Sequence, residues 1–453
     1  MERRWKRAGF WNTVTVVKKG RFIMVTRIVC FALIAVSASS ISLGSTSRLQ
    51  GLLVRGFIED DSDMFINPAL VSYYQNLLIG ELGTYEIYGT GKQMGWLPDQ
   101  SLAVTAGRGV LSGGLVLNRN ISPVDAIADY DMRLSGYPFS DPIDPINPIE
   151  VMAAYGMNGM AVGARVYLIG GGSTDKGDEP WFNGSREYKR TRRSKLWDFG
   201  GGVAWDLGQG DKVDLYANLG LFSFNAESED HYVDTLFDTT YTNINTDESE
   251  GGKYLTFGGR AFYSMTRRMK LVPLVEFTTM GFTEKAEVDV PFDTTYPDID
   301  NSHTSLMAGV GVNAELSRYS TLVVAASMCY CKDKQEREDG TDETSTWTLP
   351  LLQAGLETDL TRWFTLRMGV QKAHAKVTEK STAEGGFVLK QDWEQTRTYV
   401  DSPLDFLSLG FGVRLGKFLI DATFMEEIPF TGTYLLSGLS GNLFGKMTAT
   451  YYF

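Results

Sequence analysis

The sequence predicts an all-β protein, a transmembrane antiparallel up-and-down β-barrel of about sixteen strands with a short plug-like segment before it. The first observation is that apolar and polar residues alternate in segment after segment from about residue 80 to the C-terminus, the period of a strand with two different faces. The second is that the connections between these segments differ in length, because short turns alternate with long polar stretches. Both features are typical of barrels in bacterial outer membranes.

Residues 1–45 are predicted to be a signal peptide region. From Met24 the chain reads MVTRIVCFALIAVSASSISLGS, which is one Arg, a short apolar core and then small residues. This core is too short for a membrane-spanning helix and has the order of a secretory signal. The residues before Met24 are basic, so Met24 is a candidate for the true start, and a long basic leader is the alternative. We expect cleavage between Ala38 and Thr46, which makes this an exported protein.

Residues 46–79 precede the predicted barrel and do not alternate cleanly. They contain an acidic patch followed by F-x-N-P-A, which resembles the N-terminal box of the FadL-type long-chain fatty-acid transporter superfamily. In that family such a segment folds inside the barrel as a hatch. The resemblance implies that the hatch residues here are Asp61, Asp63, Phe65, Asn67, Pro68 and Ala69.

The resemblance covers about ten residues of this box and the last strand, and it leaves the cargo open. Barrels similar to FadL that carry the same box include secretion accessories. This sequence departs from the family in its strand count, because FadL-type barrels have fourteen strands. The alternative is that Asn67-Pro68 only turns a periplasmic segment into the first strand.

Residues 80–453 are predicted to form the barrel. Its first strand is expected near 81–90 and its last near 441–453. Fourteen more are joined in pairs by turns near 109–112, 156–159, 207–212, 266–269, 317–320, 361–363 and 416–417. The count is fourteen instead if 81–90 belongs to the preceding segment and one hairpin is misread. Long loops are expected near 119–148, 170–195, 227–251, 284–302, 334–345, 379–402 and 429–440.

The two faces of the predicted strands differ in chemistry. Aromatic residues near strand ends predict interfacial girdles at Trp197, Trp205, Tyr254, Tyr263, Tyr330, Trp347, Trp363 and Tyr451. Lumen charges are expected at Arg165, Arg260, Glu276, Glu315, Glu357, Asp359, Arg367, Arg414 and Asp421. These charges either form a transverse field that orients polar solutes or pair with one another. Inward glycines are expected to let a hatch approach the wall, and Phe222, Phe262 and Met307 to contribute to apolar pockets.

The chain ends on an alternating strand, GKMTATYYF. Apolar residues occupy one face and Lys446, Thr448 and Thr450 the other, as expected for the strand that closes a barrel. The terminal aromatic resembles the signal read by the barrel assembly machinery. The residues of this predicted assembly signal are Gly445, Met447, Tyr451 and Phe453.

One internal repeat stands out, because VDTLFDTTY at Val233–Tyr241 recurs as VDVPFDTTY at Val288–Tyr296. Duplication of a hairpin explains it without a function. The alternative is a pair of acidic loops that bind Ca²⁺ through carboxylate oxygens. The candidate ligands for this alternative are Asp234, Asp238, Asp289 and Asp293.

Composition excludes several functions. A net charge of −12 and a pI near 5.0 argue against nucleic acid as a partner. The chain has three His residues and no nucleophile elbow or H-E-x-x-H motif, so we expect neither an enzyme nor a cofactor or structural metal. Cys329 and Cys331, two apart on one strand, are expected to be reduced packing residues.

The predicted location is therefore the bacterial outer membrane, with the lipid bilayer and the assembly machinery as partners. Three functions stay open. The first is a channel or transporter that passes small solutes, and the second is FadL-like uptake of hydrophobic ligands such as long-chain fatty acids. The third is a non-transporting barrel that acts as a docking or secretion accessory. The sequence leaves open the cargo, the oligomeric state and whether the lumen is plugged.

Overall fold

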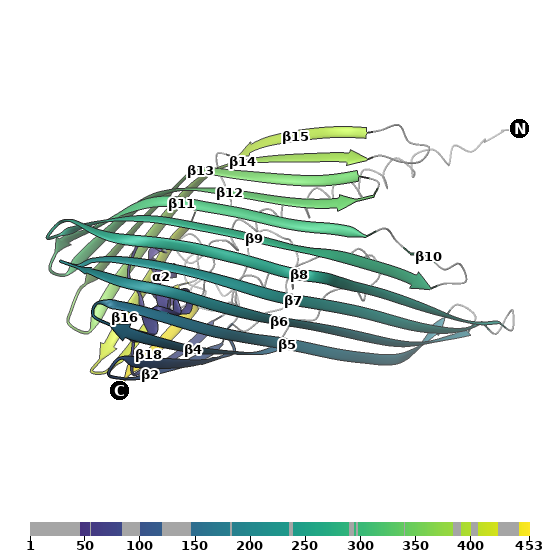
Figure 1. Cartoon of the computed structure of the whole chain (residues 1–453), viewed down its shortest axis with the longest axis horizontal. Coiled ribbons are helices and arrows are strands. Elements are labelled where there is room, and N and C mark those ends of the chain that lie inside the picture. Colours follow the sequence, from purple (N-terminus) through teal and green to yellow (C-terminus); the bar gives the residue numbers. More distant parts are fainter. Residues whose placement is uncertain are drawn as a thin grey trace, which may run out of the picture.

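A single closed β-sheet makes up most of the chain (Figure 1). The computed structural model describes residues 46–54, 56–83, 100–119, 146–181, 184–234, 239–289, 294–295, 298–338, 340–383, 391–399, 406–424 and 444–453. Three short helices come first: α2 (Thr46–Leu52), η1 (Asp61–Phe65) and η2 (Pro68–Ser72). The strands are β1 (Leu77–Gly83), β2 (Ser101–Arg108), β3 (Leu111–Leu117), β4 (Ile146–Met157), β5 (Met160–Trp181), β6 (Gly184–Gly208), β7 (Asp211–Asp234), β8 (Thr239–Thr266), β9 (Met269–Asp289), β10 (Thr294–Thr295), β11 (Ile299–Ser317), β12 (Ser320–Arg337), β13 (Gly340–Asp359), β14 (Phe364–Ala383), β15 (Gln391–Tyr399), β16 (Phe406–Leu415), β17 (Phe418–Phe424) and β18 (Phe444–Tyr452).

The sheet is antiparallel and closes on itself, because β1 pairs with both β2 and β18. Two of the eighteen segments do not add a position around the ring. β10 and β11 both pair with β9, and β15 and β16 both pair with β14. The barrel therefore has sixteen strand positions, and the predicted count of sixteen is confirmed.

The short turns predicted from the sequence join β2 to β3, β4 to β5, β6 to β7, β8 to β9, β11 to β12, β13 to β14 and β16 to β17. The β4–β5 turn illustrates their chemistry, because Asn158 and Gly159 both have positive φ, at 46° and 84°. An Asn-Gly pair in this conformation is the preferred two-residue hairpin turn. Leu77 pairs with Tyr452, so β1 begins and β18 ends at this same short-turn end.

The opposite end of the barrel differs from the prediction. β5 to β9 are 22, 25, 24, 28 and 21 residues long, whereas about 10 tilted residues suffice to cross a bilayer. In Figure 1 these strands extend to the right, beyond the ends of the other strands. The expected loops at 170–195, 227–251, 284–302, 334–345 and 379–402 are therefore wrong in large part, since strands occupy much of each range. Both faces of these extensions are polar, so no apolar period marks them.

An exposed apolar band surrounds the short-turn half of the barrel. On β6 the outward side chains Trp197, Phe199 and Trp205 are 50%, 43% and 52% exposed, and such a contiguous band suits the hydrocarbon core of a membrane. The predicted girdle residue Tyr254 is wrong, because it is buried in the lumen and its hydroxyl donates to Asp198. Among the described residues, no helix is long and apolar enough to cross a membrane.

Candidate functional site at the junction of plug and barrel

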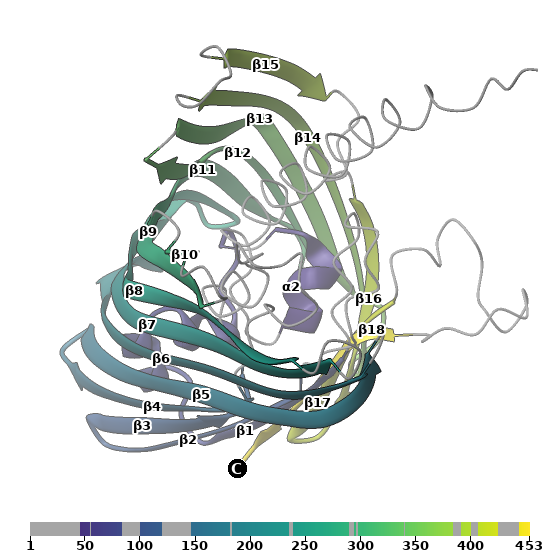
Figure 2. The same cartoon turned by 90° about the vertical axis from the view of Figure 1, so that its right-hand side faces the viewer.

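Residues 46–54 and 56–76, here called the plug, lie inside the ring of strands, and Figure 2 shows α2 within it. α2 packs against β13, β14, β16, β17 and β18, and η2 packs against β3 to β6. Val54, Phe57, Met64 and Leu70 have no exposed surface. β1 begins at Leu77, slightly before the expected boundary at residue 79.

Local hydrogen bonds shape the plug. Asp60 caps η1, since its carboxylate accepts from the Ser62 amide at 3.1 Å while Asp63 accepts from the Asp60 amide at 2.8 Å. This is a capping box built with Asp in place of Glu. Asn67 caps η2 by accepting from the Ala69 amide at 3.1 Å, and Pro68 follows at the first helical position, where a missing N–H costs nothing.

The predicted hatch box supplies much of the contact between plug and wall. The Asp63 carboxylate lies 2.5 Å from Arg260, and the Asn67 amide donates to the Val203 carbonyl at 3.0 Å. The Phe65 carbonyl accepts from Arg165 at 2.5 Å. Asp61, the remaining acidic residue of the box, is half-buried. The box thus combines helix caps with anchors to the wall.

Pro68 and Ala69 approach the wall closely at Gly163. A Cβ added to Gly163 would lie 2.3 Å from the Ala69 nitrogen and 2.4 Å from the Pro68 carbonyl carbon. At Gly369 an added Cβ would lie 2.4 Å from the carbonyl carbon of Leu52. Real Cβ atoms do not tolerate such distances to backbone, so the expectation that inward glycines admit the segment is confirmed at both positions.

A first ion-pair network joins α2 to β13, β14 and β17. Arg48 bridges Asp60 at 2.8 Å and Glu357 at 2.9 Å, and Arg367 bridges Glu357 at 2.7 Å and Asp421 at 2.5 Å. Burial alone would raise the pKa of Asp60, but the Arg48 charge and nearby hydrogen bonds outweigh it and lower the pKa to about 2. The Asp60 carboxylate is therefore charged at neutral pH.

Two further networks fix the η1–η2 part of the plug. Arg260 lies between Asp63 of the plug and Asp214 of β7, at 2.5 Å and 3.1 Å. Arg165 contacts Asp198 at 2.9 Å in addition to the Phe65 carbonyl. A buried ion pair gains little net stability, but removing one partner leaves an uncompensated charge and is costly. These networks therefore resist any partial displacement of the plug.

The nine predicted lumen charges divide into two groups. Arg165, Arg260, Glu357, Arg367 and Asp421 pair as described above, and Glu276 accepts from the Tyr216 hydroxyl. For these residues the mutual-pairing interpretation fits the geometry. The remaining three, Glu315, Asp359 and Arg414, have the predicted inward phase but lie exposed beside short turns. Phase gives the face of a strand and not the position along it, so the alternation did not predict that these three lie beside the turns, away from the plug.

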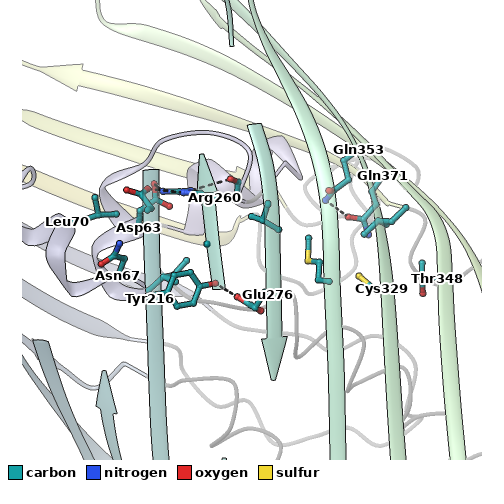
Figure 3. A pocket seen from close by; sticks show the side chains of 17 residues that line it. Asp63, Asn67, Leu70, Tyr216, Arg260, Glu276, Cys329, Thr348, Gln353 and Gln371 are labelled. Carbon is teal, nitrogen blue, oxygen red and sulfur yellow. Dashed lines mark hydrogen bonds and ion pairs between the residues drawn. The ribbon is translucent and has the colours of Figure 1, made fainter. Parts of the chain in front are cut away.

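A recess lies between the plug and the wall formed by β7 to β9 and β11 to β14 (Figure 3). About 880 Å³ of space separates its walls, including the part that opens to solvent. Plug residues form one side and strand residues the other. The apolar members of its lining are Ile66, Leu70, Leu274, Met307 and Leu351.

The recess also contains polar groups. The Gln353 amide nitrogen donates to the Leu53 carbonyl at 2.7 Å and to the Gln371 side chain at 3.1 Å. Within the described part of the chain, the Gln353 side-chain oxygen and the Thr348 hydroxyl are buried and have no hydrogen-bond partner. Buried polar atoms without partners are costly and rare. Both atoms therefore suit a ligand group that donates a hydrogen bond.

A second apolar surface continues along the same wall. On β9 the recess ends at Glu276, and an inward cluster begins a few residues further from the short turns, with Met280 and Phe282. The Phe282 ring packs edge-on against Phe222 at 5.6 Å and against Phe224 at 5.5 Å. The cluster also contains Tyr167, Ile169, Leu196, Ala226 and Tyr254.

Phe222, Phe262 and Met307, the predicted contributors to apolar pockets, are distributed over different surfaces. Phe222 lies in the inward cluster, and Met307 lines the recess. Phe262 packs with plug residues such as Leu52 and Phe57. All three point into the lumen, but only Phe222 and Met307 face surfaces that a ligand could follow.

Of the candidate calcium ligands, the structure describes Asp234 and Asp289, which lie at strand ends away from the plug. Asp234 ends β7 and Asp289 ends β9, so the described first residues of each copy of the repeat lie at the long-strand ends of these strands. Asp238 and Asp293 lie outside the described residues. Within the described ranges, no group of three His, Cys, Asp or Glu side chains could hold a metal ion.

Other sequence candidates are also located by the structure. Cys329 and Cys331 are buried and form no disulfide with each other, as expected. Of the predicted assembly signal, Gly445 and Met447 lie within β18, while Tyr451 and Phe453 are exposed near the short turns. Recognition of this strand by the assembly machinery stays a prediction.

Comparison with known proteins identifies distant structural likenesses. The chain matches no protein family and no curated protein sequence. The Pseudomonas putida toluene transporter TodX is 9% identical, over 89% of this chain and 95% of that one, with a TM-score of 0.36. The Ralstonia pickettii toluene transporter TbuX is 11% identical over 90% and 97%, with a TM-score of 0.35. A Pseudomonas aeruginosa FadL homologue is 13% identical over 90% and 98%, with a TM-score of 0.38. At these values we base no argument on the likeness.

Proposed function

We propose that this protein is an outer-membrane transporter whose plug gates the passage of a small, mainly apolar ligand that carries a hydrogen-bond donor. The observation that carries the proposal is the recess built jointly by plug and wall. Its apolar lining would hold the body of the ligand, and either the Gln353 oxygen or the Thr348 hydroxyl would accept from its polar group. A ligand in this position touches the element that blocks its path.

The inward aromatic cluster supports a direction of travel. It lines β5 to β9 on the long-strand side of the recess and includes Phe222, Phe224 and Phe282. An apolar ligand that enters from that side would meet this surface first and the recess next. This arrangement favours uptake of hydrophobic ligands over general passage of small polar solutes.

Passage would require the plug to move. Its apolar residues are buried against the wall, and three arginine-centred networks hold it. A steadily open pore is difficult to reconcile with this packing. A ligand can shift such an equilibrium only if it binds the displaced state better than the docked state, and contact with both plug and wall provides that opportunity.

The sharpest test is a reversible tether between plug and wall. A Cβ on Gly202 would lie 2.8 Å from the Asn67 side-chain carbon Cγ. Because a Cys sulfur takes the place of Cγ, Asn67→Cys with Gly202→Cys brings the two side chains close enough for a disulfide. The background carries Cys329→Ala and Cys331→Ala to prevent other pairing. Radiolabelled 4-ethylphenol is the probe, and its uptake is measured in intact cells that carry the protein in their outer membrane.

We expect the oxidised tether to abolish protein-dependent uptake and dithiothreitol to restore it. The two single-Cys variants serve as controls and should transport in both conditions. Equal uptake with the tether closed would contradict gating by the plug. Ethylbenzene, which lacks the donor, should be taken up less efficiently than 4-ethylphenol.

Ion conductance in a planar bilayer separates the other candidate functions. The intact protein should be closed, and deletion of residues 46–75, which spares β1, should open it. Steady conductance of the intact protein would favour the solute channel. Silence of both forms, together with no uptake by folded protein, would favour the docking role.

A further inference from the structure

The outward face of β6 to β8 carries three basic side chains just beyond the apolar band. Lys195 and Arg193 follow Trp197 on β6 in the direction of the long-strand end, and period-2 alternation gives them the same face. Lys253 lies on β8, level in register with Leu221 and Trp197 and next to the exposed Leu255. Arg193, Lys195 and Lys253 are here called the outer basic patch, and all three are exposed.

Strand register brings the three side chains to one area. Lys195 pairs with Ser223 of β7, Arg193 pairs with Asn225, and Lys253 pairs with Leu221. Alternate residues on a strand are about 7 Å apart and neighbouring strands about 4.8 Å apart. Arg193 and Lys195 thus flank the short neutral side chains of Asn225 and Ser223 from the β6 side, and Lys253 flanks Leu221 from the β8 side.

These charges differ from other basic residues of the long strands. Lys189, further along β6, lies 3.4 Å from Glu229, and Lys285 of β9 pairs with Glu250. Within the described residues, Arg193, Lys195 and Lys253 make no ion pair. The acidic residues nearest in register are Glu248, which pairs with Asn225 from β8 and with Lys285 of β9, and Glu227, one outward residue pair beyond Asn225. The patch is therefore a group of three positive charges without an ion pair, and Glu248 lies across Asn225 from Arg193.

We propose that the outer basic patch binds the phosphate groups of a phosphorylated lipid in the membrane leaflet on the long-strand side. The inference rests on the proposed function in one respect, namely that the barrel spans the outer membrane. Basic residues beside an aromatic interfacial residue attract anionic headgroups, and arginine binds phosphate through two parallel hydrogen bonds. The acyl chains of the same lipid would cover Trp197, Phe199 and Leu221, which are exposed on the same face.

The position of the patch favours a lipid over a soluble anion. The apolar side chains begin next to the patch, because Trp197 is the neighbour of Lys195 on the outward face of β6, on the side of the short turns. A ligand with phosphates and acyl chains joined at this spacing satisfies both surfaces at once. A free phosphate would gain only the electrostatic part, which salt screens strongly at an exposed site.

The test measures retention of a defined lipid by native mass spectrometry. The full barrel in a neutral detergent is titrated with lipid A, which carries two phosphates, and separately with phosphatidylcholine. The variant is Arg193→Gln/Lys195→Gln/Lys253→Gln. The matched control removes three lysines that are already paired with glutamates, Lys189→Gln/Lys332→Gln/Lys380→Gln, and has the same change in net charge.

We expect the triple patch variant to bind lipid A about tenfold to a hundredfold more weakly, and the matched control to bind it like the wild type. Phosphatidylcholine should bind weakly and equally to all three proteins. Equal loss in variant and control, or unchanged binding in the variant, would overturn the proposal. Retention of the heat-modifiable folded form confirms that the variant is intact.

The result is independent of transport. Lipid retention is measured on purified barrel without any flux, so failure of the tether experiment leaves it readable. Conversely, the patch variant should still take up 4-ethylphenol if the proposed route through the lumen holds, because Arg193, Lys195 and Lys253 point away from it. The two proposals can therefore fail separately.

Discussion

The two halves of the barrel interior are built on different principles. In the short-turn half, wall residues face the plug and are buried, and Arg260 and Arg367 each contact more than one carboxylate. In the long-strand half, β5 to β9 extend outward with polar side chains on both faces, and pairs such as Lys189–Glu229 are half-exposed. The same strands thus serve as packed wall at one end and hydrated extension at the other.

This difference has an energetic consequence. Exposed ion pairs contribute little to stability, because water competes for both charges. Buried pairs contribute mainly by making partial displacement costly, since each partner left behind is a charge out of water. The plug half should respond to single substitutions strongly and the extended half weakly, and the following predictions test that contrast from the largest expected effect to the smallest.

Arg367→Met should lower the free energy of opening of the plug by about 3–5 kcal/mol, because Glu357 and Asp421 lose their common partner. Lys189→Met in the extended half should cost less than about 1 kcal/mol. Hydrogen exchange of amides in residues 46–76 measures the local free energy of opening. Equal protection in both variants would show that the networks do not hold the plug.

Gly163→Ala should cost about 1–3 kcal/mol of plug docking, because the new methyl group meets the backbone of Pro68 and Ala69. Gly80→Ala is the control, since nothing lies within 4 Å of its added Cβ. The readout is amide exchange in residues 68–72. Unchanged protection in Gly163→Ala would mean that η2 is packed against the wall less tightly than its contacts imply.

Thr348→Val should leave stability unchanged or raise it, because an unpartnered buried hydroxyl is replaced by a methyl group of similar shape. Affinity for 4-ethylphenol should fall about twofold to tenfold through the lost hydrogen bond. Affinity for ethylbenzene should not fall. Isothermal titration with both ligands, combined with thermal unfolding, distinguishes a binding role from a packing role.

The contribution of Asp60 to the stability of the docked plug should not change with pH over the neutral range. Its pKa in the folded protein is lowered to about 2, so its stabilising charge is present above its ordinary value near 4. That contribution should be lost as the pH falls toward 2. Amide exchange in residues 46–65, corrected for intrinsic rates, should show this acid-side loss, and Asp60→Asn should remove it.

Much of the barrel could be predicted because lipid and water impose opposite chemistry on alternate residues. That alternation located the short turns and the inward phase of Arg165, Arg260 and Arg367. It could not locate the extended parts of β5 to β9, where both faces are wet and no period remains. Tyr254 was misassigned because nearness to a strand end was given more weight than its phase.

The site was harder to predict than the sheet. The box around Asn67 signalled an N-terminal segment of special importance, but its partners are set by the three-dimensional packing of distant strands. Arg48 of the plug meets Glu357, 309 residues later in the chain, and no local pattern reports such a contact. The recess depends on the same long-range arrangement, so its lining residues carried no common signal.

The seam between β1 and β18 sets the order of events during biogenesis. Ser47 lies within hydrogen-bond distance of Thr448, 401 residues away, so part of the site for α2 does not exist until the last strand has been synthesised. Until then β1 lacks its β18 partner and offers an unpaired edge to other chains. Contacts of such high sequence separation form slowly. The nascent barrel therefore depends on protection from aggregation until its two ends meet around the N-terminal segment.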